Sequence, residues 1–318
     1  MSLSLADARF LFDRALGLLR RGATSLRTRG WRATWQRTQA YLGLPTRRPS
    51  SHLEFPAAAD FEVIAIPRSD QPRASIIIPV YNQFSHTQAC LNALAAYPPV
   101  ARVEIIIVDD GSSDATVTDL PEIQGLRYHR RAANGGFIAA CNDGAALARG
   151  EFLVFLNNDT VPQSGWLDAL LGTFDAHADV GLVGAQLLYR DGRLQEAGGF
   201  LTSDGHAESY GRFDVPEHPR YSYLRDADYA SGAALAIPRA LFAQVGGFDP
   251  RYAPAYYEDT DLAFAVRAAG RRVLYQPTAR VVHDEGATSG TDTGSGTKAY
   301  QVRNRERFAE HRGAELAA

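Results

Sequence analysis

Cysteine is nearly absent from this 318-residue chain, in which only Cys90 and Cys141 occur. Neither lies in a CxxC pair or in a cluster with histidines, so a zinc site and a disulfide framework are both disfavoured. Free buried cysteines behave as small apolar side chains. We therefore expect two buried, reduced thiols and a protein of a reducing compartment, the cytoplasm.

Long apolar runs are also missing. No stretch reaches the roughly 18 to 20 apolar residues that a membrane-spanning helix needs. The segment from Met1 to Arg9 lacks the basic-then-apolar order of a secretory signal. Apolar residues make up 45% of the chain and charged residues 22%, as in ordinary globular proteins. The composition predicts a globular protein with one large domain or two small ones.

Lysine is limited to Lys298, so the basic charge comes almost wholly from arginine. Residues 1–48 hold ten arginines and two acids, about +8, although the whole chain carries −3. Apolar residues recur at helical spacing over 5–42. We predict a basic helical extension over 1–48 and a linker over 49–72. Two interpretations stay open: peripheral contact with the inner face of a membrane through anionic lipid, and packing on the body or on another subunit.

The motifs of three common enzyme classes are missing. No GxxxxGK[ST] loop occurs, which leaves an ATPase unsupported. Gly135-Gly136 is not a GxGxxG fingerprint, and Ser231-Gly232 is not a GxSxG elbow.

The pattern that is present is an alternation of strands and helices. Apolar, β-branched runs at 75–80, 103–108 and 151–156 are typical of strands buried on both faces. Helical segments follow them, and Asn134 is expected to cap a helix that runs to about 148. Residues 180–236 look strand-rich, and a clear amphipathic helix covers 259–269. The pattern predicts an α/β fold with a mostly parallel central sheet and helices on both faces.

Acidic clusters follow two of the predicted strands. Asp109-Asp110-Gly111-Ser112 could bind a nucleoside, or could be a plain turn that caps the next helix. Asn157-Asn158-Asp159 could supply a carboxylate to a hard divalent cation, or could again be a turn. In parallel sheets, ligands bind beyond the carboxyl ends of the strands, where both clusters fall.

Two further features are candidates for chemistry. Glu258, Asp259 and Asp261 open a helix, where the helix dipole favours acids; Glu258 or Asp259 could also serve as a general base, and Asp261 could brace the helix. His283 follows a strand-like pair of valines. It is either a structural residue or a ligand of a metal or a phosphate.

Several sequence blocks occur in an order that no single motif would establish. They are Ser75-Ile76-Ile77-Ile78-Pro79-Val80-Tyr81-Asn82, Asp109-Asp110-Gly111-Ser112, Asn134-Gly135-Gly136-Phe137, Leu156-Asn157-Asn158-Asp159, Gly246-Gly247-Phe248-Asp249, Glu258-Asp259-Thr260-Asp261-Leu262 and His283. Together they resemble the bacterial family-two glycosyltransferases over about residues 73–310, with 311–318 as a tail. Gln195-Glu196-Ala197-Gly198-Gly199 and Tyr256-Tyr257-Glu258-Asp259 resemble the subgroup of surface-polysaccharide and O-antigen assembly, which includes rhamnosyltransferases.

This resemblance implies a single nucleotide-sugar-binding domain of the glycosyltransferase A type. It implies Asp259 as the base, with Glu258 as the rival, and Asp159 and His283 as ligands of Mn²⁺ or Mg²⁺. The family's Asp-x-Asp metal motif is here Asn157-Asn158-Asp159, which lacks the first carboxylate. The residues implied to bind the nucleotide sugar are Pro79, Tyr81, Asp109, Asp110, Ser112, Asn134, Gly135, Asn157 and Asn158.

The implied reaction is the inverting transfer of a sugar, with rhamnose as one candidate. The donor would be a nucleoside-diphosphate sugar and the acceptor a hydroxyl of a glycan or a lipid-linked glycan, in surface-polysaccharide assembly. No nucleic-acid partner is expected. One alternative is a non-catalytic partner of the same fold that binds nucleotide sugars or glycans. Another is a sugar nucleotidyltransferase, which usually has a Gly-rich loop where this chain has Tyr81-Asn82-Gln83-Phe84.

Overall fold

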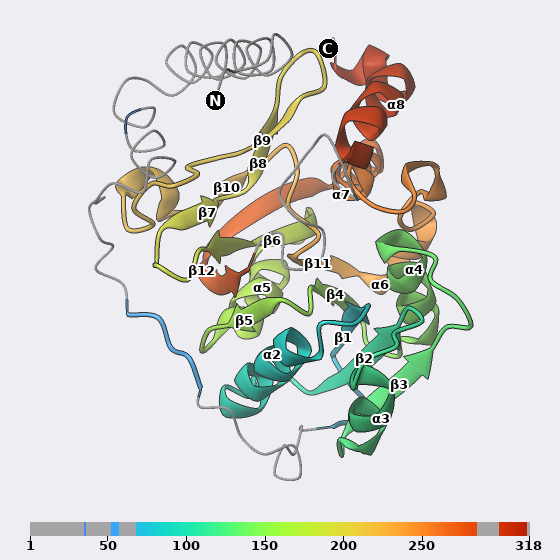
Figure 1. Ribbon diagram of the computed structural model, residues 1–318. Coiled ribbons are helices and arrows are strands. Elements are labelled where there is room, and N and C mark those ends of the chain that lie inside the picture. Colours follow the sequence, from blue (N-terminus) through green and yellow to red (C-terminus); the bar gives the residue numbers. More distant parts are fainter. Residues whose placement is uncertain (1–34, 36–51, 57–67, 285–298, 317–318) are drawn as a thin grey trace, which may run out of the picture.

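The computed structural model describes residues 35, 52–56, 68–284 and 299–316 (Figure 1). The predicted extension over 1–48 and most of the predicted linker therefore lie outside the described residues, and the interpretations of them stay predictions. Within the described part of the chain, no helix is both long and apolar enough to cross a membrane.

The first half of the domain is a parallel sheet with helical connections. Strand β1 (Ala74–Val80) lies between β2 (Val103–Asp109) and β4 (Phe152–Leu156), and β3 (Leu126–Arg130) extends the sheet beyond β2. All four run in the same direction, as the apolar strand runs predicted. The helices between them are α2 (Phe84–Ala96), α3 (Thr116–Asp119), the short 3₁₀ helix η2 (Leu120–Glu122) and α4 (Phe137–Leu147).

The second half completes the sheet with strands of both directions. Strand β11 (Ala234–Pro238) lies antiparallel between β4 and β6 (Val180–Leu188), and β12 (Arg272–His283) pairs with β6 in parallel. The sheet order is β10-β12-β6-β11-β4-β1-β2-β3, with β5 on β12 and β7 on β6. The carboxyl ends of β1, β2, β4, β6 and β12 therefore share one edge. The predicted mostly parallel α/β sheet is confirmed.

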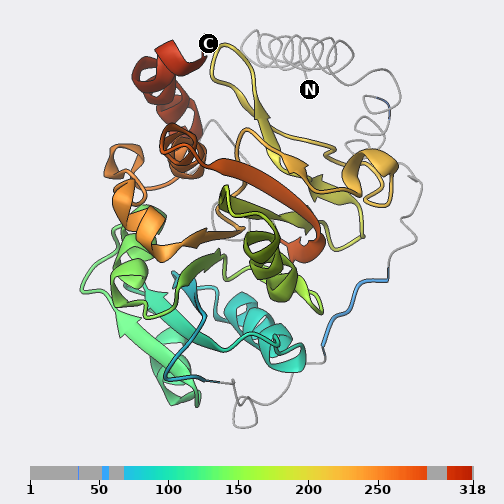
Figure 2. The same ribbon diagram turned by 180° about the vertical axis from the view of Figure 1, so that it is seen from behind.

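The remaining elements connect and cover these strands (Figures 1 and 2). They are β5 (Thr160–Pro162), α5 (Trp166–Ala176), β7 (Leu194–Glu196), β8 (Gly199–Leu201), β9 (Ala207–Ser209), η3 (Pro219–Tyr221), β10 (Arg225–Asp226), α6 (Arg239–Gln244), η4 (Pro250–Tyr252), α7 (Glu258–Ala268) and α8 (Ala299–Leu316). Strands β8 and β9 form a separate hairpin. Helix α8 runs across positions 310 and 311, where the tail was predicted to begin.

The start of α4 differs from the prediction. The N-cap residue is Gly136, with a φ of 85°, and no side chain caps the helix. Asn134 is exposed, two residues before the N-cap, so the predicted Asn134 cap is wrong. The physical reason is steric. The chain turns through a left-handed conformation that glycine adopts readily, and a Cβ on Gly136 would lie 2.5 Å from Pro254 Cβ.

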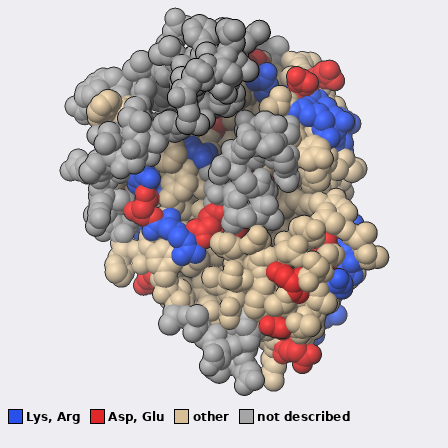
Figure 3. Space-filling model, in the orientation of Figure 1, with Lys and Arg blue, Asp and Glu red and all other residues tan. Residues whose placement is uncertain are grey.

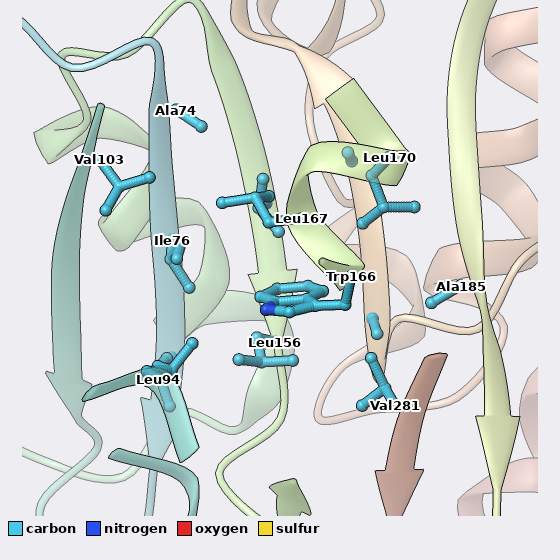
Figure 4. Packing of buried hydrophobic residues seen from close by; sticks show 14 of the residues in the cluster. Ala74, Ile76, Leu94, Val103, Leu156, Trp166, Leu167, Leu170, Ala185 and Val281 are labelled. Atoms are coloured by element: carbon cyan, nitrogen blue, oxygen red, sulfur yellow. The ribbon is translucent and has the colours of Figure 1, made fainter. Parts of the chain in front are cut away.

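The core lies on both faces of the sheet because successive strand residues point to opposite sides. Ile76 and Ile78 pack with α2 and α5 on one face, whereas Ile77 packs with α4, α6 and α7 on the other. Trp166 and its apolar neighbours fill the space between α5 and the strands (Figure 4). Cys90 and Cys141 are both buried and free, as predicted. The rigid sheet fixes the positions of the loops at its carboxyl edge.

We predict that Leu170→Ala lowers the free energy of unfolding by about 3 kcal/mol. Leu170 is fully buried in α5, and large-to-small changes in cores cost about 2–5 kcal/mol. Urea denaturation followed by circular dichroism measures the change. The exposed Val100→Ala is the control, with an expected change within about 0.5 kcal/mol. Equal effects of the two substitutions would contradict the described packing.

Candidate active site

The loops after β1 and β2 are joined to each other. The Asn82 N–H donates to Ser112 Oγ at 2.7 Å, and Asn82 Oδ1 accepts from the Ser113 N–H at 2.8 Å. Asn82 has a φ of 54°, a conformation that asparagine tolerates better than most residues. The two loops therefore form one unit at the carboxyl edge. On it Tyr81 is 43% exposed, and Pro79 is half-buried.

Asp109 holds the loop after β2 in place through hydrogen bonds to its buried carboxylate. Its side chain is fully buried, and its carboxylate accepts hydrogen bonds from the Ser112 N–H at 2.8 Å, Tyr128 Oη at 2.5 Å and Arg130 Nη1 at 2.7 Å. Burial, reinforced by the hydrogen bond to the carboxylate, raises the pKa of Tyr128 to about 12. All these donors belong to the protein, so in this structure Asp109 fixes the turn.

Asp110 holds the loop that precedes α4. Its carboxylate accepts from the backbone N–H groups of Gly135 at 2.9 Å and Gly136 at 2.7 Å, and it pairs with Arg131. Arg131 also contacts Asp143 at 2.7 Å. The exposed Asn134 and Gly135 therefore stand beside the β2 end. The structure brings together the predicted residues of these two sequence blocks.

Asp159 and His283 lie together, as the sequence blocks suggested. His283 Nε2 is 3.3 Å from Asp159 Oδ1. Gln195 Nε2 donates to the His283 carbonyl at 3.3 Å, which turns Gln195 Oε1 toward His283 Nδ1 at 2.8 Å. This arrangement favours a proton on Nδ1, so Nε2 is the ring atom that faces Asp159. Gln195 is thus a supporting residue for the pair.

These residues fit a divalent cation. Asp159 Oδ1 and Asn157 Oδ1 are buried and have no hydrogen-bond partner within the described ranges. Buried acceptors without donors are costly, and a proton on His283 Nε2 or a cation beside Asp159 Oδ1 would stabilise the pair. Asn158 is held aside by donating to Thr87 Oγ1 at 3.0 Å. One carboxylate, one imidazole and donor phosphate oxygens would make a usable cation site.

Asp259 is the more accessible acid at the start of α7. Asp259 Oδ2 accepts from the Gly232 N–H at 3.0 Å, and Oδ1 accepts from the Thr260 N–H at 2.7 Å. Burial raises the pKa of Asp259, although these N–H groups oppose that effect. Glu258 is more deeply buried, and its Oε2 has no hydrogen-bond partner among the described residues. Burial raises the pKa of Glu258 well above its ordinary value.

Glu196 is a candidate site residue to which the sequence alone assigned no role. This buried carboxyl accepts from the Ser231 N–H at 3.1 Å and from Ser209 Oγ at 2.8 Å. Burial and, after it, the nearby Asp259 raise the pKa of Glu196 to about 7. Two consecutive backbone amides thus hold two acids: the Ser231 N–H binds Glu196, and the Gly232 N–H binds Asp259. The Gln195-Glu196 block, which carries part of the family resemblance, was the signal in the sequence.

The segment before β11 links Asp259 to the end of β4, which leads to the pair of Asp159 and His283. The Asn157 N–H donates to the Ala233 carbonyl at 2.9 Å, and the neighbouring Gly232 holds Asp259. A Cβ on Gly232 would lie 3.8 Å from Asp259 Cβ. The end of β4, which carries Asp159, is therefore tied to the segment that positions Asp259.

A second acidic group lies away from these residues and already has a structural role. Ligand atoms of Asp249, Asp261 and His311 lie within 4.8 Å of one another. However, Asp261 accepts from Arg312 Nε at 2.7 Å and from Tyr252 Oη at 3.2 Å. Asp261 thus braces α7 against α8.

Known proteins resemble this chain in sequence and in fold. Residues 75–220 match the family model described as Glycosyl transferase family 2. This region is a family 2 glycosyltransferase domain. The chain resembles GalNAc-T7 in complex with UDP, GalNAc and Mn²⁺, with a TM-score of 0.63 at 18% identity over 78% of this chain and 50% of that one. A Pyrobaculum calidifontis mannosyltransferase bound to GDP-Man and Mn²⁺ gives a TM-score of 0.56 at 18% identity, over 96% of this chain and 75% of that one. These likenesses support the glycosyltransferase A fold.

The first two curated relatives are much longer than this chain. The chain is 32% identical over 235 residues to the uncharacterized protein y4gI of Sinorhizobium fredii, an alignment that covers 70% of this chain and 26% of that protein. It is 27% identical to the O-antigen biosynthesis protein RfbC of Myxococcus xanthus, over 76% of this chain and 20% of that protein. A Mycobacterium tuberculosis N-acetylglucosaminyl-diphospho-decaprenol L-rhamnosyltransferase is 28% identical, over 62% of this chain and 72% of that protein. The chain thus spans about a quarter or less of the first two.

We predict that Gly136→Ala destabilises the domain by about 1–3 kcal/mol. The substitution combines a left-handed backbone with a collision at Pro254. Urea denaturation measures the loss. Gly172→Ala is the matched control, because beyond its chain neighbours and the nearby backbone of its own helix no heavy atom lies within 4 Å of the new methyl group, and alanine favours the α5 helix. A stable Gly136→Ala would show that the α4 start lies elsewhere.

We predict that Glu196→Gln flattens the fall in melting temperature between pH 5 and pH 8. The pKa of Glu196 rises from 4.5 to about 7 on folding, so the unfolded chain loses its proton first as the pH rises, and stability falls across this window. Glutamine cannot ionise, and its amide can donate to Ser209 Oγ. The exposed Glu217→Gln serves as the control. A wild-type slope in Glu196→Gln would contradict the raised pKa.

Proposed function

We propose that this domain transfers a sugar from a nucleoside-diphosphate sugar to an acceptor hydroxyl, with inversion at the sugar carbon. One observation carries the proposal. In a chain whose residues 75–220 match the family 2 glycosyltransferase model, a partly accessible carboxylate at a helix start, Asp259, is tied through Gly232 and Ala233 to the strand end that bears Asp159.

In this proposal Asp259 is the general base. Burial raises its pKa toward the working range of a base. The Gly232 and Thr260 amides orient its two oxygens, so one face of the carboxylate is fixed before the acceptor arrives. Asp259 takes the hydroxyl proton as the acceptor oxygen forms its bond to the sugar carbon. Glu258 stays the rival, although its deeper burial makes it less accessible.

The donor would lie over the carboxyl edge of the sheet. Tyr81 and Pro79 would contact the nucleoside. The Asn134-Gly135 loop would face the donor, and Asp110 would hold this loop in place by accepting a hydrogen bond from the Gly135 N–H. Acidic and basic residues are interspersed on the described part of the face in Figure 3. A bound Mn²⁺ or Mg²⁺, held by Asp159 and His283, would offset the charge of the departing diphosphate.

Inversion follows from the use of a single base. An acceptor oxygen that attacks from the side opposite the leaving diphosphate reverses the configuration, as water does in inverting hydrolases. The C–O bond to the acceptor forms as the bond to the diphosphate breaks, and the proton passes to Asp259. No covalent sugar–enzyme bond is required.

The substrates are proposed from the relatives. The named L-rhamnosyltransferase and O-antigen protein support deoxyhexose donors such as activated rhamnose, and a glycan or lipid-linked glycan as acceptor, in surface-polysaccharide assembly. A panel of nucleoside-diphosphate sugars, assayed for donor hydrolysis and transfer, tests this. Donor binding without any turnover would instead support a non-catalytic partner.

We predict that Asp259→Asn reduces transfer by at least about 10³-fold while nucleotide binding stays within about threefold. The amide is similar in size but cannot take the proton. Transfer assays and calorimetry with the nucleoside diphosphate measure both properties. Near-normal turnover would move the base to Glu258, for which Glu258→Gln is the parallel variant.

We predict that Asp159→Ala weakens manganese-dependent donor binding by about tenfold or more. The variant removes the only carboxylate of the Asn157-Asn158-Asp159 block. Calorimetry with the nucleoside diphosphate, with and without manganese, measures the difference. Asp249→Ala is the control for the second acidic group. Unchanged affinity in Asp159→Ala would refute the assignment.

A further inference from the structure

A segment of backbone immediately before the proposed base is held by the side chains of α8. Residues 251–257 run from η4 to the residue that precedes α7. Tyr256 and Tyr257 in it have φ angles of 76° and 72°, which are unfavourable for residues with a Cβ. Such a conformation persists only where surrounding contacts hold it.

Asn304 supplies three of those contacts. Its side chain is fully buried, and its amide nitrogen lies 2.6 Å from the Tyr252 carbonyl, 2.9 Å from that of Ala255 and 3.0 Å from that of Tyr256. These carbonyls have a single side-chain donor in common. An amide can donate two protons, so both are used within this one segment.

The neighbours of Asn304 on α8 bind the same segment. Arg303 donates to the Ala253 carbonyl, and Arg307 donates to the Arg251 carbonyl at 2.7 Å. Phe308 packs against Tyr257, with ring centroids 5.4 Å apart. Figures 1 and 2 both place α8 beside α7. One helix thus contacts almost every residue from 251 to 257.

The held segment touches both halves of the site. It leads directly into Glu258 and Asp259, and its Pro254 lies against Gly136 of the donor-side loop. The Ile138 N–H donates to the Pro254 carbonyl at 3.3 Å. A shift of this segment would therefore move the base relative to the loop that Asp110 holds.

We infer that Asn304 is a positioning residue that sets the placement of Asp259 by donating to the carbonyls of Tyr252, Ala255 and Tyr256; this rests on the proposed role of Asp259 as the base. Misplacement of a catalytic group by about 1 Å costs about 10²-fold in rate. Donor binding should suffer less, because Asp110 holds Gly135 and Gly136 independently of α8.

The test compares Asn304→Asp and Asn304→Ala in the full chain. Aspartate keeps the size of asparagine but donates nothing when ionised, so a role of volume alone would leave Asn304→Asp close to wild type. The exposed Val302→Ala is the control on the same helix. Transfer is measured per nucleotide-binding site, counted by calorimetry with the nucleoside diphosphate, so that unfolded protein does not lower the apparent rate.

We expect both Asn304 variants to lose about 10²-fold in transfer per site, with nucleoside-diphosphate affinity within about threefold. Hydrogen exchange should quicken by about tenfold or more over 252–261 and much less in β1 and β2. Hydrogen exchange needs no activity, so it tests whether Asn304 holds this segment even if the proposed function fails. Exchange that is unchanged over 252–261, exchange that rises equally throughout the chain, or a wild-type transfer rate per site would overturn the inference.

Discussion

Carboxylates at the carboxyl edge of the sheet are buried, and each must be hydrogen-bonded, protonated or paired with a cation. Asp109 and Asp110 meet this constraint with protein donors, so they fix the two loops of the donor side. Glu196 and Asp259 meet it with the successive amides of Ser231 and Gly232. Asp159 leaves one oxygen without a donor in the described structure. Asp159 therefore differs from the other four acids in having an oxygen available to a cation.

The loops of the site are positioned by distant parts of the chain. The rigid sheet places the ends of β2, β4 and β12 along one edge. The segment before β11 then joins Asp259, the proposed base, to the end of β4, and α8 holds the segment before α7. Positioning of this kind is what catalysis by proton removal requires, since a base acts only within hydrogen-bond reach.

The sequence predicted the fold well because buried parallel strands have a distinctive apolar pattern. The apolar runs matched β1, β2 and β4, and the acid-rich helix start matched α7. Contacts between distant residues could not be predicted. The prediction of an Asn134 cap was wrong because the contact between Gly136 and Pro254 leaves no trace in local sequence. Adjacent Asp109 and Asp110 have different partners, and the Ser231 amide that holds Glu196 is 35 residues away. The role of Asn304 depends on three carbonyls about 50 residues earlier.

The central claim is that the donor diphosphate meets a cation between Asp159 and His283, beside Asp259. The most direct measurement is anomalous diffraction at the manganese edge from crystals of the protein with a nucleoside diphosphate and Mn²⁺. The account predicts one strong peak bonded to Asp159, His283 Nε2 and diphosphate oxygens. A peak among Asp249, Asp261 and His311 instead, or a bound diphosphate on another face with no manganese between Asp159 and His283, would contradict it.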